Sequence, residues 1–136
     1  MKNTIIVLIF AFMLCTINTE KVDAYAACSS GYKWLTCTAY PDYSVSPGLM
    51  ATQGAYLPIG THSYSGYSWS GDSYSRIYSQ VECSSTGFCT ADMANPTINL
   101  VNQNTSGTFY NASGYVVLEA YVPAGSTGSS YISIWW

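Results

Sequence analysis

The chain has 136 residues, with four Lys or Arg, seven Asp or Glu and one His, which gives a formal net charge of −3 at pH 7. From Ala27 onward the only cationic side chains are Lys33 and Arg76. A nucleic-acid groove needs many cations to neutralise phosphates, so the composition excludes nucleic-acid binding. For the same reason it disfavours binding to an anionic membrane surface.

Residues 1–26 have the three parts of a secretory signal peptide. A lysine near the start precedes an apolar run over 5–15, and an A-x-A cleavage motif ends at Ala26. The apolar run is too short for a transmembrane helix, and nothing later in the chain is apolar enough to span a membrane. We expect cleavage after Ala26, with Ala24 as the alternative, which leaves one extracellular domain over 27–136.

The segment that ends at Cys28 also invites comparison with a bacterial lipid-attachment box, in which small residues precede a cysteine. Tyr25 stands where such boxes normally have leucine. Secretion is therefore the preferred prediction. A periplasmic location and a lipid anchor at Cys28 are the minor alternatives.

The domain opens with short strands separated by turn signals. A first strand, rich in aromatic and β-branched residues, is predicted over 32–40, and Pro41 begins the turn that ends it. The stretch 49–57 is either a second strand or a weak helical turn. A strand is favoured because Gly54 and Pro58 both oppose a helix.

The clearest local signal is the stretch 62–82, in which residue types alternate on both sides of the turn sequence 70–73. Gly71 at the first central position suits a type II′ turn, which requires φ > 0 there. The sequence therefore predicts a β-hairpin. In the register that this turn fixes, Trp69 lies opposite Tyr74, Tyr67 opposite Arg76 and Ser65 opposite Tyr78.

Alternation gives this hairpin two different faces. One face carries Tyr67, Trp69, Tyr74, Arg76 and Tyr78. The other carries Tyr64, Ser68, Ser70, Ser73, Ser75, Ile77, Ser79 and Val81. Serines are too small and polar to form a good core unless something packs closely on them, so we expect a solvent-exposed serine face and a buried aromatic face. The alternative is an exposed aromatic platform, for which Tyr and Trp are suited because each pairs an apolar ring with a polar tip.

The remaining elements are again strands. A loop over 84–87 follows the hairpin, and short strands are predicted over 97–101 and 107–110. The strongest strand covers 115–122, whose Glu119 marks one face as at least partly solvated. We expect it to form a final antiparallel hairpin with the strand 131–136.

No amphipathic helix is predicted after the signal peptide. About seven short strands with turns between them indicate an all-β fold, a small antiparallel β-sandwich-like domain. Four cysteines remain in this exported chain, and an even count indicates two disulfides. Of the three connectivities we favour the local pairs Cys28–Cys37 and Cys83–Cys89, each stabilising by about 2–3 kcal/mol in the loop-entropy account.

No pattern of residues predicts a catalytic or metal site. A hydrolase triad would need His62, Asp72 and a serine, but the chain has no G-x-S-x-G elbow. A glycosidase pair would have to come from scattered acids, namely Asp42, Glu82, Asp92 and Glu119. Zinc is disfavoured because there is no C-x-x-C motif and the single histidine lies far from the cysteines in sequence. We therefore predict a protein without enzymatic activity, metal or cofactor.

The preferred interpretation is a small secreted binding module. The ligand is a neutral glycan or a protein surface, and the predicted binding residues are Tyr67, Trp69, Tyr74, Arg76 and Tyr78. The alternative is a structural or self-associating extracellular protein that pairs through an apolar edge at 132–136. A secreted hydrolase and a membrane-inserting toxin are less favoured. Asn104 and Asn111 begin N-glycosylation sequons, which matter only in a eukaryotic cell.

Overall fold

The computed structural model describes residues 25–41 and 48–136. All eleven elements in these residues are β-strands, which confirms the all-β prediction, although the sequence predicts only about seven. No helix in the described ranges is long and apolar enough to cross a membrane. The predicted signal peptide lies outside the described residues except for Tyr25 and Ala26, and Asp42 also lies outside them.

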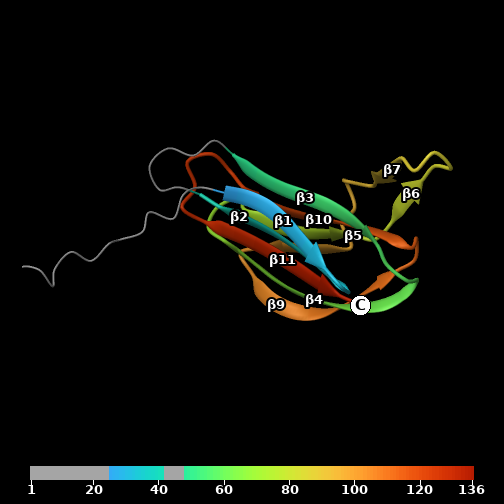
Figure 1. Ribbon diagram of the computed structural model, residues 1–136. Coiled ribbons are helices and arrows are strands. Elements are labelled where there is room, and N and C mark those ends of the chain that lie inside the picture. Colours follow the sequence, from blue (N-terminus) through green and yellow to red (C-terminus); the bar gives the residue numbers. More distant parts are fainter. Residues whose placement is uncertain (1–24, 42–47) are drawn as a thin grey trace, which may run out of the picture.

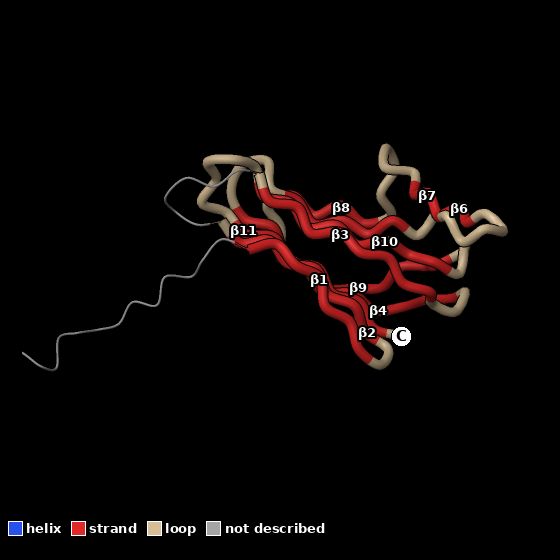
Figure 2. Tube along the Cα trace, turned by 45° about the horizontal axis from the view of Figure 1, so that its top comes forward, coloured by secondary structure: helices blue, strands red, loops and turns tan. Residues whose placement is uncertain are grey.

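Two antiparallel sheets pack face to face (Figure 1). The larger sheet has the strand order β1-β2-β11-β4-β9, with bounds β1 Tyr25–Gly31, β2 Trp34–Tyr40, β11 Ser129–Trp135, β4 Gly60–Trp69 and β9 Asn104–Asn111. The smaller sheet has the order β3-β10-β5-β8, with bounds β3 Leu49–Tyr56, β10 Tyr115–Val122, β5 Tyr74–Tyr78 and β8 Ile98–Val101. A two-stranded ribbon of β6 (Val81–Cys83) and β7 (Cys89–Ala91) projects from one end (Figure 1, Figure 2).

The core lies between the inner faces of the two sheets, where alternate residues of each strand are buried. The central strands supply most of it, with Leu35, Cys37, Ala39, Val116, Leu118, Ala120, Val122, Ile132 and Ile134. Fully burying one of the Val, Leu or Ile side chains contributes roughly 1.5–3 kcal/mol. This alternation is what the sequence shows over 32–40 and 115–122, and both strands form where they are predicted.

The predicted hairpin over 62–82 is wrong, because β4 and β5 belong to different sheets. Trp69 pairs with Ser129 of β11, whereas Tyr74 pairs with Tyr121 of β10. The turn carries the chain from one sheet to the other. Gly71 does have the predicted positive φ, at 61°, but its neighbour Ser70 is left-handed as well, at 71°.

The expected burial of the two faces is also wrong, because the serine side of β4 and β5 points into the sandwich. Ser68, Ser73, Ser75 and Ser79 are all buried, as is Ser130 of β11. The hydroxyl groups of Ser68, Ser75, Ser79 and Ser130 are hydrogen-bonded, and Ser75 Oγ donates to the Tyr67 carbonyl at 2.7 Å and lies 2.7 Å from Ser130 Oγ. Ser73 Oγ is buried without a hydrogen-bond partner among the described residues. The small serine side chains let the two sheets approach closely, and most of the buried hydroxyl groups are satisfied.

The expected final hairpin does not form either, since β10 and β11 lie in different sheets. The loop over 123–128 makes this second crossover beside the first. At Gly128 a Cβ atom would overlap the Trp69 carbonyl oxygen, so only glycine allows the two crossovers to pack. Strand β11 lies between β2 and β4, so the predicted apolar edge at 132–136 is the middle of a sheet.

Both favoured disulfides are present. Cys28 and Cys37 lie directly opposite each other on β1 and β2, with the Cys37 side chain fully buried. Cys83 and Cys89 close the turn between β6 and β7. One bridge therefore fixes the edge of the larger sheet, and the other fixes the projecting ribbon.

Candidate binding face

The five predicted binding residues lie on two different faces of the molecule. Tyr67 and Trp69 point outward from β4 in the larger sheet, whereas Tyr74, Arg76 and Tyr78 point outward from β5 in the smaller sheet. The structure therefore brings them together as a pair and a triplet. They do not form the single face that the predicted hairpin would create.

On the smaller sheet the triplet is engaged with its own neighbours. The Arg76 guanidinium stacks 3.6 Å from the centre of the Tyr74 ring and donates from Nε to Asn99 Oδ1 at 2.9 Å. The Tyr78 hydroxyl, buried with its ring, donates to Glu119 Oε1 at 3.2 Å. Glu119 itself is buried among these groups, although the sequence predicts that its face of the strand is at least partly solvated. Arg76 Nε and Nη1 and the Tyr78 hydroxyl are thus already engaged within the protein.

Burial raises the pKa of the Tyr74 and Tyr78 hydroxyls, and the adjacent Glu119 carboxylate raises both further. Arg76 Nη1 lies 3.9 Å from Glu119 Oε1, which pairs the buried carboxylate with its nearest cation. A buried carboxylate needs a paired cation and hydrogen bonds to compensate for its burial, so this network has a structural role. The triplet is thus better suited to holding β5 on β10 than to binding a ligand.

The outer face of the larger sheet, made of the alternate residues that point away from the core, is called the neutral face below. None of its five strands contains Asp, Glu, Lys or Arg. The single histidine of these strands, His62, points inward, and its Nε2 lies 2.7 Å from the Pro58 carbonyl oxygen. Asp72 lies beyond the far end of β4, about 23 Å or more along the strand from His62, so the triad residues are not brought together.

Five rings on the neutral face form an aromatic cluster, Tyr25, Tyr40, Tyr67, Trp69 and Tyr131. The Tyr67 and Tyr131 rings stack with centroids 5.5 Å apart, and Tyr25 stacks on Tyr40 at the same separation. The Tyr40 and Tyr67 hydroxyl oxygens lie 2.6 Å apart, which joins the two pairs. Tyr25 and Trp69 are 45% and 51% exposed, so the cluster presents ring surface and hydroxyl groups to solvent.

Tyr67 stays uncharged well above neutral pH. Burial, together with the hydrogen bond with Tyr40, raises the pKa of Tyr67 from 10.0 to about 12. A ligand that meets this part of the face therefore contacts only neutral groups.

At the other end of the same strands lies a second aromatic pair, Trp34 and Trp135, which sit opposite each other on β2 and β11. Trp135 is 43% exposed. Between this pair and the aromatic cluster the strands carry small hydroxyl residues, and Thr36 Oγ1 lies 2.7 Å from Ser133 Oγ. The neutral face is thus aromatic at both ends and hydroxyl-rich in between.

Sequence reasoning finds Tyr67 and Trp69 of this face but misses Tyr25, Tyr40, Tyr131 and Trp135. The alternation within each strand is visible in the sequence. The strand order that sets β2, β11 and β4 side by side comes from pairings far apart in the chain, which no local pattern reports.

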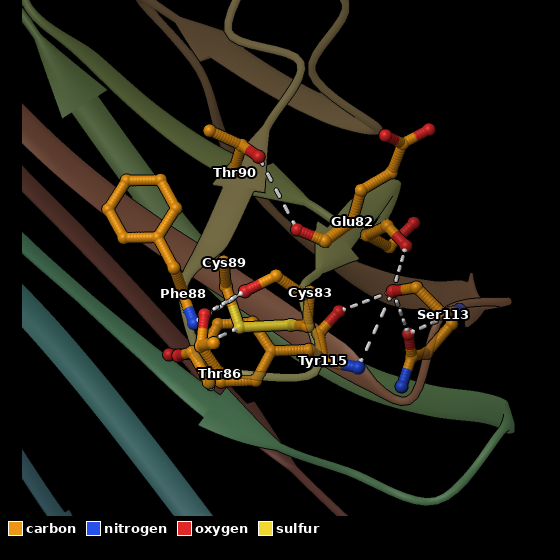
Figure 3. The surroundings of a disulfide bond; sticks show 12 residues. Glu82, Cys83, Thr86, Phe88, Cys89, Thr90, Ser113 and Tyr115 are labelled. Carbon is orange, nitrogen blue, oxygen red and sulfur yellow. Dashed lines mark hydrogen bonds between the residues drawn. A yellow bond between two sulfur atoms is a disulfide. The ribbon is translucent and has the colours of Figure 1, made fainter.

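A second candidate site is a hollow of about 540 Å³ at the base of the ribbon. It lies between the ribbon and the turn that joins β9 to β10, and Glu82 and Asp92 are its acidic residues. Figure 3 shows Glu82 and Ser113 beside the Cys83–Cys89 bridge. Asp92 accepts hydrogen bonds from Asn95 and from the Ala94 backbone, which lower its pKa and occupy its carboxylate within its own turn.

The two sequons differ in their surroundings. Asn111 is fully buried, and its Nδ2 donates to the carbonyl oxygens of Leu57 and Pro58, both at 3.2 Å. Asn104 is exposed at the start of β9. A glycan on Asn111 is incompatible with this fold, whereas one on Asn104 is sterically allowed.

Comparison of the chain with protein-family models, with curated proteins and with solved structures gives no match. Within residues 25–41 and 48–136, no group of three or more His, Cys, Asp or Glu side chains is arranged to hold a metal ion. The neutral face is accordingly the feature from which a function is proposed.

Proposed function

We propose that this protein is an extracellular binding module that holds a neutral glycan on the neutral face. The observation that carries the proposal is the coincidence of five uncharged strands with a half-exposed aromatic cluster. Sugars offer both C–H surfaces and hydroxyl groups, and rings with polar tips complement both kinds of group. In this proposal Tyr67 and Trp69 keep their predicted role, and Tyr40 and Tyr131 join them. Tyr25 joins them only in a chain cleaved after Ala24, because cleavage after Ala26 removes it.

The absence of charge selects among ligands. A carboxylated or sulfated polymer gains affinity from cations, and the neutral face supplies none. A neutral glycan requires only apolar contact and neutral hydrogen bonds. The proposed extracellular location is supported by the two disulfides, because such bonds persist in oxidising compartments.

Replacement of Trp69 tests the proposal. Its ring is half-exposed at the end of β4, so Trp69→Ala removes ligand contact without opening a core cavity. Loss of a central aromatic contact typically costs about 2 kcal/mol, so we expect affinity to fall about 30-fold. The measurement is pull-down and depletion of the purified protein on cellulose, chitin, mannan and neutral glucan.

The matched control is Tyr56→Ala, an exposed ring on the outer face of the smaller sheet. This variant should bind like the wild type. The proposal is overturned if Trp69→Ala binds every matrix as well as the wild type does. It is also overturned if the wild type binds none of the four polysaccharides. Thermal unfolding of all three proteins confirms that they are folded.

A further inference from the structure

The neutral face has exposed aromatic rings at both ends of one seam, the line where β4 and β11 pair. Trp69 lies opposite Ser129 at one end of this seam, and Trp135 lies opposite Ser63 at the other. Ser129 and Trp135 are six positions apart on β11. At about 3.3 Å per residue, the two tryptophans are on the order of 20 Å apart.

Between the tryptophans the seam carries two further pairs, Tyr131 with Tyr67 and then Ser133 with Ser65. All four side chains bear a hydroxyl group, and none is charged. The strands are extended and continuous here, so these groups form one row along the seam toward Trp135. The seam therefore offers ring, hydroxyl and ring contacts in succession along one direction.

A small sugar is normally held in an enclosed hollow that surrounds most of its surface. The hollow at the ribbon is lined by none of the seam residues. A single sugar or a disaccharide on the seam reaches Trp69 or Trp135 but does not reach both.

Resting on the proposed glycan binding, we infer that the ligand is an extended neutral polysaccharide chain that lies along the β4–β11 seam and contacts Trp69 and Trp135 together. Two contacts on one chain reinforce each other, because the second forms within a complex that the first already holds. Affinity should therefore rise with chain length until the chain spans both tryptophans. Removal of either ring should return a long chain to the affinity of a short one.

The experiment is calorimetric titration with β-1,4-linked glucose oligomers and N-acetylglucosamine oligomers, from the disaccharide to the octasaccharide. We expect wild-type affinity for one series to rise by about tenfold or more with length. Trp69→Ala and Trp135→Ala should each bind the octasaccharide nearly as weakly as the disaccharide. Trp135→Tyr, which keeps a ring at the position, should recover part of the length dependence.

The control on the same face is Tyr110→Ala, because Tyr110 is exposed on β9 and lies off the seam. It should keep the wild-type length dependence. If Trp135→Ala also keeps it while Trp69→Ala loses binding, the inference is wrong and the proposed function stands. If wild-type affinity does not depend on length in either series, the inference is wrong. If the wild type also binds no neutral polysaccharide, the proposed function fails as well.

Discussion

At the scale of single residues, the serines between the sheets are as much a part of the core as the aliphatic residues. Ser75 illustrates this, since its Oγ donates to the Tyr67 carbonyl and accepts from the Tyr131 backbone amide at 3.1 Å. A larger side chain at this position would force the sheets apart. The hydroxyl group also satisfies backbone groups that would otherwise be buried without a partner.

Replacing Ser75 by Ala should therefore lower the free energy of unfolding by about 1–3 kcal/mol, because buried polar partners lose their bonds. Ser75→Leu should be more destabilising, since overpacking adds a further 1–3 kcal/mol. Urea denaturation measures both changes. Ser106→Ala, on the exposed outer side of β9, is the control and should stay within about 0.5 kcal/mol of wild type. Equal stability of Ser75→Ala and Ser106→Ala would contradict this account.

Tyr67 predicts a response to alkali. Its pKa is raised from 10.0 to about 12 in the folded state, so between these values the folded protein keeps a proton that the unfolded chain has lost. The resulting stabilisation is complete below pH 10 and is lost as the pH rises toward 12. In Tyr67→Phe the fall in unfolding free energy between pH 10 and 12 should be shallower, although Tyr74 and Tyr78 still contribute.

Urea denaturation at a series of pH values measures this slope. Trp69→Phe is the control for lost packing, because neither ring titrates, and its slope should match that of the wild type. A Tyr67→Phe slope equal to both would show that the hydroxyl is not shielded in the folded protein.

At the scale of elements, the alternation in 62–82 predicts both strands but not what they pair with. The tight turn at Gly71 serves a hairpin or a crossover between sheets equally well, and a left-handed Ser70 is a conformation that few serines adopt. Local signals thus predict the strands around 115–122 and both disulfides. The placement of β11 in the middle of the larger sheet depends on distant pairings, and so does the aromatic cluster.

The ribbon should be the first element to respond to reductant. Cys83 is exposed and Cys89 half-buried, whereas Cys37 is fully buried in the core. Under native conditions a thiol reaches exposed sulfur sooner, so brief reduction and alkylation should label Cys83 and Cys89 before Cys28 and Cys37. Peptide mass spectrometry reports the order, and equal labelling of both pairs would argue against it. In urea all four cysteines should be labelled together.

At the scale of the whole molecule, charge is segregated from the proposed binding surface. Among the described residues, Lys33 and Asp72 lie in turns, Arg76 and Glu119 on the smaller sheet, and Glu82 and Asp92 in the ribbon segment. The larger sheet lies between its outer face and the charges of the smaller sheet, whereas Lys33 and Asp72 lie in turns at the ends of its strands. The protein is acidic as a whole and yet neutral where binding is proposed.

Glycan binding should therefore depend little on ionic strength. Raising the salt from about 0.1 M to about 1 M shortens the Debye length from about 10 Å to about 3 Å, which weakens exposed ionic contacts. Affinity for the neutral polysaccharide should change by less than about threefold over this range. A loss of tenfold or more, measured by the same depletion assay, would indicate that charged residues outside the neutral face contribute to binding.

The central place of β11 also has a consequence for the order of folding. This strand lies between the pair β1 and β2 and the pair β4 and β9. Only β11 joins the two pairs by backbone hydrogen bonds within the larger sheet. Such non-local pairing is typical of domains that fold in milliseconds to seconds. A chain in synthesis that has not yet reached Ser129 holds every residue of the aromatic cluster except Tyr131, but it lacks the strand that sets β2 and β4 on either side of it. The neutral face is therefore completed only when β11 is in place.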